Sequence, residues 1–162
     1  MSTSHVTALR CKDTASAGDL YMSFELGDKQ WKLSIGDGRS AVSRFSLAAG
    51  DQTGVAQCIL RAGRRFGTPN GAQVHSCYEA GRDGWWLHRW LTGLGVDNVV
   101  VDAASIEVNR RARRAKTDRL DARKLVTMLV RHAEGEREVW HVVHVPSEAD
   151  EDRRHLERER QT

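Results

Sequence analysis

The sequence of 162 residues predicts an α/β fold built on a mixed five-stranded sheet with flanking helices. Three observations favour this fold. Near the start of the chain, apolar and polar residues alternate with a period of two between short Gly-Asp turns, which is typical of antiparallel strands. Further along, the apolar period lengthens to that of an amphipathic helix. A short apolar run at Asn98–Val101 then stands between two helical segments, as buried strands of parallel sheets do.

The opening segment predicts an antiparallel meander of three strands. The first strand is expected over Leu20–Leu26, where alternate residues are apolar. Gly27 and Asp28 are expected to form a two-residue hairpin turn in which the glycine takes a positive φ. Two further strands are expected over Lys29–Ile35 and Ala41–Leu47.

The remainder of the chain predicts alternating helices and strands. Helices are expected over Thr53–Phe66, Asp83–Leu94 and Asp118–His132, and strand-like segments over Ala72–Tyr78, Asn98–Val101 and Val139–Val145. Ser147 begins a capping box that starts another helix. A meander followed by alternating helices and strands is the element order of a ribonuclease H-type mixed sheet. Ligands of such sheets bind at the carboxyl ends of the parallel strands.

Composition and charge narrow the class of protein. No apolar run approaches the ~20 residues that span a bilayer, and the N-terminus lacks the apolar core of a signal peptide. The three cysteines have no CxxC spacing, so we expect a reducing, cytoplasmic location and no membrane association.

Basic residues are concentrated in one stretch. Between Arg110 and Arg131 the chain has nine Lys or Arg and two acids, whereas its overall net charge is only +3. Such a stretch is typical of a surface that binds nucleic acid, and equally of a solvated helix face. The residues expected to hold a phosphate backbone are Arg110, Arg111, Arg113, Arg114, Lys116, Arg119 and Arg123.

Four acids stand at positions where carboxylates could hold a metal ion. Glu25 lies on the first strand, and Glu79 follows the strand over Ala72–Tyr78. Asp118 and Asp121 are three residues apart and share one face of a helix. Carboxylates on a packing face are costly unless they are paired or bound to cations, and oxygen ligands of this kind suit Mg²⁺.

Each acid also has an ordinary structural interpretation. Asp118 could cap a helix with Asp121 in its first turn, and Glu79 could bind backbone amides of the following turn. Glu25 could pair with Lys29 or Arg39. Asp102, which follows the apolar run, is a competing ligand. The tryptophans 85, 86 and 90 are at helical spacing, which favours a place in the core over a surface on which bases stack.

Three motifs together resemble the N-terminal half of the insertion sequence 110 family of transposases. They are Cys77-Tyr78-Glu79-Ala80-Gly81-Arg82-Asp83-Gly84, then Val99-Val100-Val101-Asp102, and then Arg113-Arg114-Ala115-Lys116-Thr117-Asp118-Arg119-Leu120-Asp121-Ala122. The resemblance covers about residues 20–160 of the chain. It implies a RuvC-like, ribonuclease H-fold domain of the DEDD type.

The resemblance also implies roles for the four acids. They would bind Mg²⁺, or alternatively Mn²⁺, with Glu79 as the second acid, Asp118 as the third and Asp121 as the fourth. The first acid of the family is normally Asp, whereas the corresponding strand of this chain carries Glu25. The longer glutamate side chain moves this carboxylate outward by one methylene.

The resemblance implies a division of the chain and a set of partners. Residues 1–18 would be a flexible tail, 19–146 the RuvC-like DEDD domain, and 147–162 the start of a coiled-coil helix that ends early. Members of the family continue into a C-terminal domain that supplies a catalytic Ser, so this chain is similar to a truncated transposase and is expected to be inactive without that domain. The expected partners are transposon and target DNA, a structured guide RNA and, in the full-length form, further copies of the chain.

The sequence therefore predicts a DNA transposase or recombinase domain that takes part in Mg-dependent strand cleavage and exchange. Two alternatives stay open. One is a metal-dependent, structure-specific nuclease that acts without a Ser partner. The other is a nucleic-acid-binding remnant without catalysis, in which the acids only cap helices.

Overall fold

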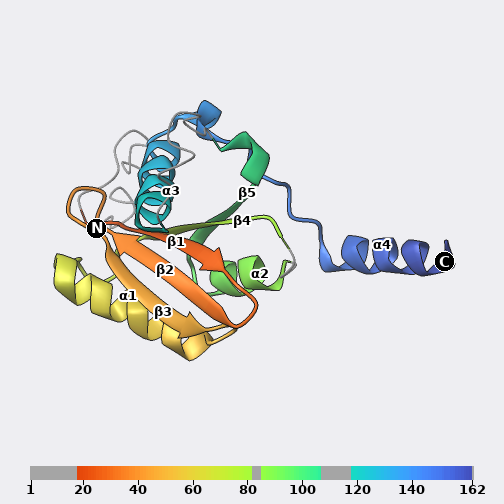
Figure 1. Ribbon diagram of the computed structural model, residues 1–162, viewed down its shortest axis with the longest axis horizontal. Coiled ribbons are helices and arrows are strands. Elements are labelled where there is room, and N and C mark those ends of the chain that lie inside the picture. The colour runs from red at the N-terminus through yellow and green to blue at the C-terminus, as the bar shows by residue number, and fades with distance from the viewer. Residues whose placement is uncertain (1–17, 82–84, 107–117, 162) are drawn as a thin grey trace, which may run out of the picture.

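A computed structural model describes residues 18–81, 85–106 and 118–161, and the side chains of 118–122 lie outside the described part. The expected tail, Asp83 and most of the basic stretch also lie outside it. Five strands form one mixed sheet in the order β3-β2-β1-β4-β5 (Figure 1). Their bounds are Leu20–Leu26 (β1), Gln30–Gly36 (β2), Ser43–Ala48 (β3), Val74–Glu79 (β4) and Asp97–Val101 (β5). The predicted α/β class with a mixed five-stranded sheet is confirmed.

The sheet has an antiparallel half and a parallel half. β1 pairs antiparallel with β2, and β2 pairs antiparallel with β3, as the predicted meander requires. β1 and β4 run parallel, as do β4 and β5. The carboxyl ends of β1, β4 and β5 therefore meet at one end of the sheet.

The hairpin between β1 and β2 differs in detail from the prediction. The Gly27 amide donates to the Gln30 carbonyl (3.0 Å), so Asp28 and Lys29 are the two loop residues. Gly27 does not have a positive φ, and that expectation is wrong. Glycine suits this position for a different reason, because a Cβ atom there would lie only 2.7 Å from the Gln30 carbonyl oxygen.

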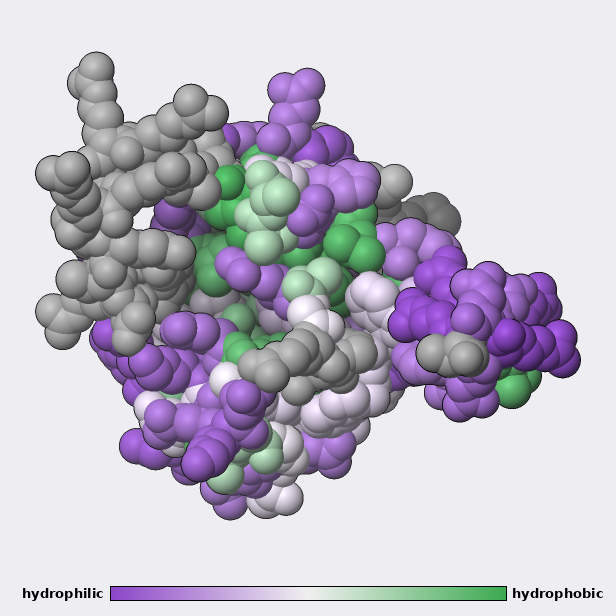
Figure 2. All heavy atoms as spheres, turned by 45° about the vertical axis from the view of Figure 1, so that its right-hand side comes forward, coloured by the Kyte–Doolittle hydropathy of each residue, from purple (hydrophilic) through white to green (hydrophobic). Residues whose placement is uncertain are grey.

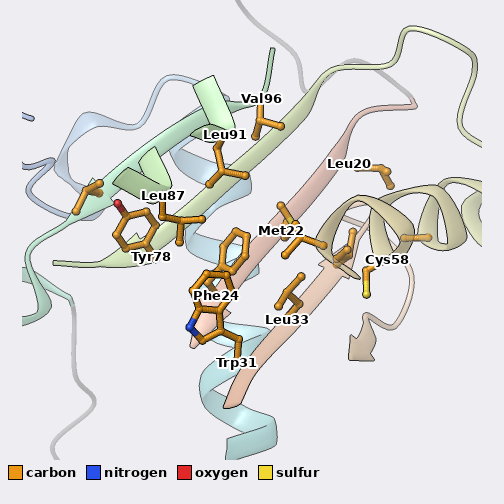
Figure 3. Packing of buried hydrophobic residues seen from close by; sticks show 14 residues of the cluster. Leu20, Met22, Phe24, Trp31, Leu33, Cys58, Tyr78, Leu87, Leu91 and Val96 are labelled. Carbon is orange, nitrogen blue, oxygen red and sulfur yellow. The ribbon is translucent and has the colours of Figure 1, made fainter. Parts of the chain in front are cut away.

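Two helices cover one face of the sheet. They are α1 (Gln52–Phe66) and α2 (Trp86–Gly93), which lie below the sheet in Figure 1. Asp51 caps α1 by accepting from the Gly54 amide (2.9 Å), and Gly67 ends it in the left-handed conformation. Between these helices and the sheet lies the larger apolar core, which contains Phe24 and Leu33 of the sheet, Cys58 of α1, and Leu87 and Leu91 of α2 (Figure 3).

The helix α3 (Asp118–Ala133) covers the opposite face (Figure 1). A second apolar cluster lies beneath it and contains Tyr21, Cys77, Val101 and Leu129, all of which are buried. The side chains of β1 and β4 therefore alternate between two cores, which explains why their central residues are buried on both faces.

The segment predicted as a strand over Val139–Val145 is not a strand. A 3-10 turn, η3 (Arg137–Val139), is followed by one isolated bridge between Val101 and Val142. Val139 and Trp140 are buried in the cluster beneath α3. The apolar pattern of this segment thus reflects a loop that fills the core, and not a ladder of paired residues.

The last helix, α4 (Glu148–Arg160), projects from the rest of the molecule (Figure 1). Ser147 caps it by accepting from the Asp150 amide (3.2 Å), as the predicted capping box requires. No residue of α4 is buried, and in Figure 2 it forms the mainly hydrophilic projection on the right. An ion pair between Arg89 and Glu151 (2.8 Å) joins it to α2. No helix in the described part of the chain is both long enough and apolar enough to cross a membrane.

Candidate functional site

Glu25 and Glu79 lie next to each other at the carboxyl end of the parallel strands. Glu79 is the last residue of β4, and Glu25 is the last but one of β1; both are exposed. The parallel register pairs Phe24 with Tyr78, so the next step along both strands places Glu25 beside Glu79. Because neighbouring strands are about 4.8 Å apart and paired residues point to the same face, the two carboxylates share one face at this end.

This face is the one that α3 covers. Side chains alternate along a strand, so Glu25 points to the same side as Tyr21, and Glu79 to the same side as Cys77. Both Tyr21 and Cys77 belong to the cluster beneath α3. Burial, together with the negative charge of Glu79, raises the pKa of the Cys77 thiol. The two carboxylates therefore extend the α3 face of the sheet beyond its core.

The C-terminal half of α3 lies at the opposite end of this face. A Cβ atom at Gly36, the residue paired with Tyr21, would lie 3.8 Å from Val126 Cγ1. One at Gly38 would lie 3.3 Å from Val130 Cγ2. Val126 and Val130 are thus near the amino end of β1, and the first turn of α3 lies toward the carboxyl end of β1.

The backbone dimensions bring the first turn of α3 to about the same level along the sheet as the two glutamates. Asp118 is eight residues before Val126, which is about 12 Å along a helix. Glu25 is four residues after Tyr21, which is about 13 Å along a strand. The turn that carries Asp118 and Asp121 is therefore at about the height of Glu25 and Glu79 along the sheet.

Several predicted site residues lie wholly or partly outside the described residues. Of Asp118, Asp121 and Arg119 the structure describes the backbone, but not the side chain. Arg110, Arg111, Arg113, Arg114 and Lys116 lie outside the described residues. Arg123 is exposed on α3. Among the described side chains, no three His, Cys, Asp or Glu residues come close enough together to hold a metal ion; of the four predicted ligands, only Glu25 and Glu79 belong to that set.

The ordinary interpretations of the acids can be compared with the observed contacts. Among the described residues, neither the Glu25 nor the Glu79 carboxylate has a hydrogen bond or an ion pair, although Lys32 is the cross-strand neighbour of Glu25 on the same face. Arg39 lies beyond Gly38, at the amino end of β1, which excludes it as a partner of Glu25. The competing ligand Asp102 is engaged as a cap, because its carboxylate accepts from the Ala104 amide (3.0 Å).

At the opposite end of the same face, a histidine joins two acids that the sequence did not single out. His75 Nε2 lies 3.0 Å from Asp19 Oδ2, and Nδ1 lies 3.2 Å from Asp97 Oδ2. The His75 ring stacks on Tyr21, with 5.0 Å between the ring centroids. These residues are far apart in the chain, and only the pairing of β1, β4 and β5 brings them together, so no local pattern could reveal them.

The electrostatics of this cluster favour a charged imidazole. Burial alone would lower the pKa of His75, but the hydrogen bonds and negative charges of Asp97 and Asp19 outweigh it and raise that pKa. The hydrogen bond from His75 lowers the pKa of Asp97 in turn. The cluster is therefore a satisfied ion network that ties the amino ends of three strands together.

The tryptophans of α2 are not all in the core. Trp85 and Trp90 pack partly buried against it, as predicted. Trp86 is 39% exposed and stacks on Trp31 of β2, with 5.8 Å between the ring centroids and 24° between the planes. For Trp86, the prediction of a core position is wrong, because it is the first residue of α2 and lies at the edge of the layer.

Comparisons with known proteins give one informative similarity. No protein-family model matches the chain. The chain is 37% identical over 148 residues to a curated protein of Sinorhizobium fredii (strain NBRC 101917 / NGR234) named "Putative transposase y4rJ". The match covers 88% of this chain and 37% of that protein, so the chain spans little more than a third of its relative's length.

Proposed function

We propose that this chain is a DNA transposase domain of the DEDD type, with a ribonuclease H-like, RuvC-like fold. The observation that carries the proposal is the adjacency of Glu25 and Glu79 at the carboxyl end of two parallel strands, on the face covered by α3. The similarity to a protein named as a transposase supports the same assignment. The order of a meander followed by a parallel half is compatible with the ribonuclease H type and supports this fold assignment.

The chemistry of the site fits a divalent cation. Two exposed carboxylates about one strand spacing apart repel each other, and of their paired strand neighbours only Lys32, opposite Glu25, is basic, so a net negative charge remains. We infer that Glu25 and Glu79, with Asp118 and Asp121 of α3, hold Mg²⁺ or Mn²⁺. When bound, such a cation would stabilise negative charge on the phosphate at which a strand is cut.

The protein's own part in the reaction is to position DNA. The open end of the sheet lets a phosphate approach Glu25 and Glu79 from solvent, since both side chains are exposed. The basic residues Arg110, Arg111, Arg113, Arg114, Lys116, Arg119 and Arg123 would hold the backbone on either side of that phosphate. For the whole transposase we propose strand exchange, binding of a guide RNA, self-association, and a coiled coil that begins with α4.

A metal titration tests the proposal. A cation at about a hundred times its dissociation constant stabilises the folded state by about 2.7 kcal/mol, or about 5 to 10 °C for a domain of this size. We expect Mn²⁺ to raise the melting temperature of the wild type and of Glu134→Gln, an exposed control beyond the C-terminal end of α3. The rise should be lost in Glu79→Gln and reduced in Glu25→Gln.

An equal rise in all four proteins would contradict a metal site at Glu25 and Glu79. If the rise in melting temperature depends on Glu25 and Glu79, the protein is then incubated with Mg²⁺ and branched DNA. This second experiment distinguishes a nuclease that acts alone from a domain that needs further parts of a transposase. Cleavage that is lost in Asp118→Ala favours the structure-specific nuclease.

The concentration of charge between Arg110 and Arg131 favours a second candidate, a nucleic-acid-binding domain without catalysis. This candidate predicts DNA binding that persists in EDTA and in Asp121→Asn. Binding should become much weaker, and less sensitive to salt, when Arg113 and Arg114 are both replaced by Ala.

A further inference from the structure

We propose that Trp86 is a surface on which an unpaired nucleobase stacks, beside the carboxylate end of the sheet. This inference rests on the proposed function only in taking a nucleic acid as the ligand. It assigns a binding role to a side chain outside the acidic residues and outside the basic stretch.

The first observation is that Trp86 is both exposed and rigidly supported. Its ring stacks on Trp31, which is only 1% exposed, and Trp31 in turn meets the Phe24 ring edge to face at 6.1 Å. Trp31, itself packed against Phe24, thus covers one side of the Trp86 indole. A flat ring that is already packed on one side loses little conformational freedom when a second flat ring stacks on it.

The second observation is the position of this ring. Trp31 is the cross-strand partner of Leu26, the residue that follows Glu25. Trp86 begins α2, which is the first helix after Glu79 and β4. The Trp31–Trp86 stack and the two carboxylates are therefore at the same end of the sheet, on its two opposite faces.

This arrangement suits a single strand better than a duplex. Layers packed on a sheet are about 10 Å from it, so a short stretch of single strand crossing the open end could place a phosphate at the carboxylates and a base on Trp86. In a duplex the base faces are covered by their neighbours. Unpaired bases offer a π face of any sequence, which is why aromatic side chains bind single strands with little sequence preference.

Other exposed apolar side chains do not fit this role. In the described part of the chain, the remaining large ones are aliphatic, namely Leu60, Leu94, Val142 and Leu156. They lie on different segments, and none can stack on a base. Trp86 is the one member of this set with the chemistry that a base recognises.

The test compares single-stranded and duplex DNA of the same sequence by fluorescence anisotropy, in EDTA so that no metal contributes. Aromatic stacking is worth about 1–3 kcal/mol per base, so Trp86→Ala should weaken binding of the single strand about tenfold. Duplex binding should be unchanged. Trp86→Phe should restore most of the affinity, and Leu94→Ala, an exposed control next to the other end of α2, should bind as the wild type does.

The inference is overturned if Trp86→Ala binds the single strand as tightly as the wild type, or loses single-strand and duplex binding equally. The melting temperatures of Trp86→Ala and Trp86→Phe establish that both variants are folded. An RNA strand of matched sequence shows whether the stacked base comes from DNA or RNA. Because the metal titration of Glu25 and Glu79 uses no nucleic acid, either proposal can fail while the other survives.

Discussion

On the face of the sheet that α3 covers, the carboxylates at the two ends have opposite surroundings. At the amino end, Asp19 and Asp97 hold His75 between them, and the imidazole offsets their charge. At the carboxyl end, Glu25 and Glu79 stand side by side, and of their paired strand neighbours only Lys32, opposite Glu25, is basic. The difference fits our proposal that the amino end is complete within the protein, whereas the two carboxylates of the other end bind a cation from outside.

Both ends depend on the same helix. α3 packs on β1, β2 and β4 through the cluster that contains Leu129, and its C-terminal half lies at the His75 end. Its first turn carries two of the acids assigned to the other end. The packing of α3 therefore sets the geometry of both ends at once.

The largest expected effect comes from loosening this helix. Leu129 is 2% exposed, so Leu129→Ala should lower the free energy of unfolding by about 2–5 kcal/mol, through lost burial and a cavity. Urea denaturation measures this change. Leu60→Ala, at a residue that is 66% exposed on α1, should stay within about 0.5 kcal/mol of the wild type. If Leu129→Ala lowers the free energy of unfolding only slightly, then α3 is not the element that joins the two ends.

The next effect concerns the amino end and depends on pH. Removing one partner from a largely buried hydrogen-bonded group costs about 1–3 kcal/mol, so His75→Gln should be destabilised by this amount near pH 6. A raised histidine pKa stabilises the fold below its ordinary value of 6.5, and this contribution is lost as the pH rises through the raised value. The lowered pKa of Asp97 adds stability above its ordinary value of 3.8, which is lost in acid.

The difference between the wild type and His75→Gln should therefore be greatest between about pH 4 and 6.5, and should shrink in alkali. The difference is the quantity to measure, because burial lowers the pKa of His132 and of His88, and these groups give the opposite pH dependence. The positive charge of Arg137 also lowers the pKa of both Asp97 and His132. His155→Gln, at an exposed residue of α4, is the control. A difference that is independent of pH would show that His75 acts by packing alone.

The sequence predicts the residues at the carboxyl end of the sheet better than those at its amino end. The strand β1 has the predicted bounds, because its alternation and the following Gly-Asp pair are local signals. Glu25 and Glu79 could be singled out because each stands at or near a strand end. Their adjacency depends on the parallel register of β1 and β4, which no local pattern encodes.

The errors have the same physical origin. No local pattern predicts the cluster of Asp19, His75 and Asp97, because it joins residues from three separate segments. The strand predicted over Val139–Val145 fails because an apolar run can fill a core without pairing. Helical spacing predicts a core position for Trp86, but it does not show how far the neighbouring layer extends.

The smallest expected effect is the sharpest test of the carboxyl end. Like charges on directly neighbouring strands are destabilising, so Glu79→Gln should raise the free energy of unfolding slightly, by at most about 0.5 kcal/mol. Glu25→Gln should gain less, because it also removes the charge opposite Lys32. Added salt should shrink this gain, because the Debye length at about 0.1 M is roughly 10 Å, longer than the separation of the two strands. Urea denaturation without metal at low and high salt measures both.

Asp97→Asn is the matched comparison, since the same loss of charge removes a partner of His75 and should destabilise the protein. If Glu79→Gln instead costs as much as Asp97→Asn, then Glu79 has a partner within the fold. The carboxyl end would then be as complete as the amino end, and the reason for placing a cation there would be lost. A carboxylate pair that lowers stability when no metal is bound, but is needed for stabilisation by Mn²⁺, has its use in binding and not in folding.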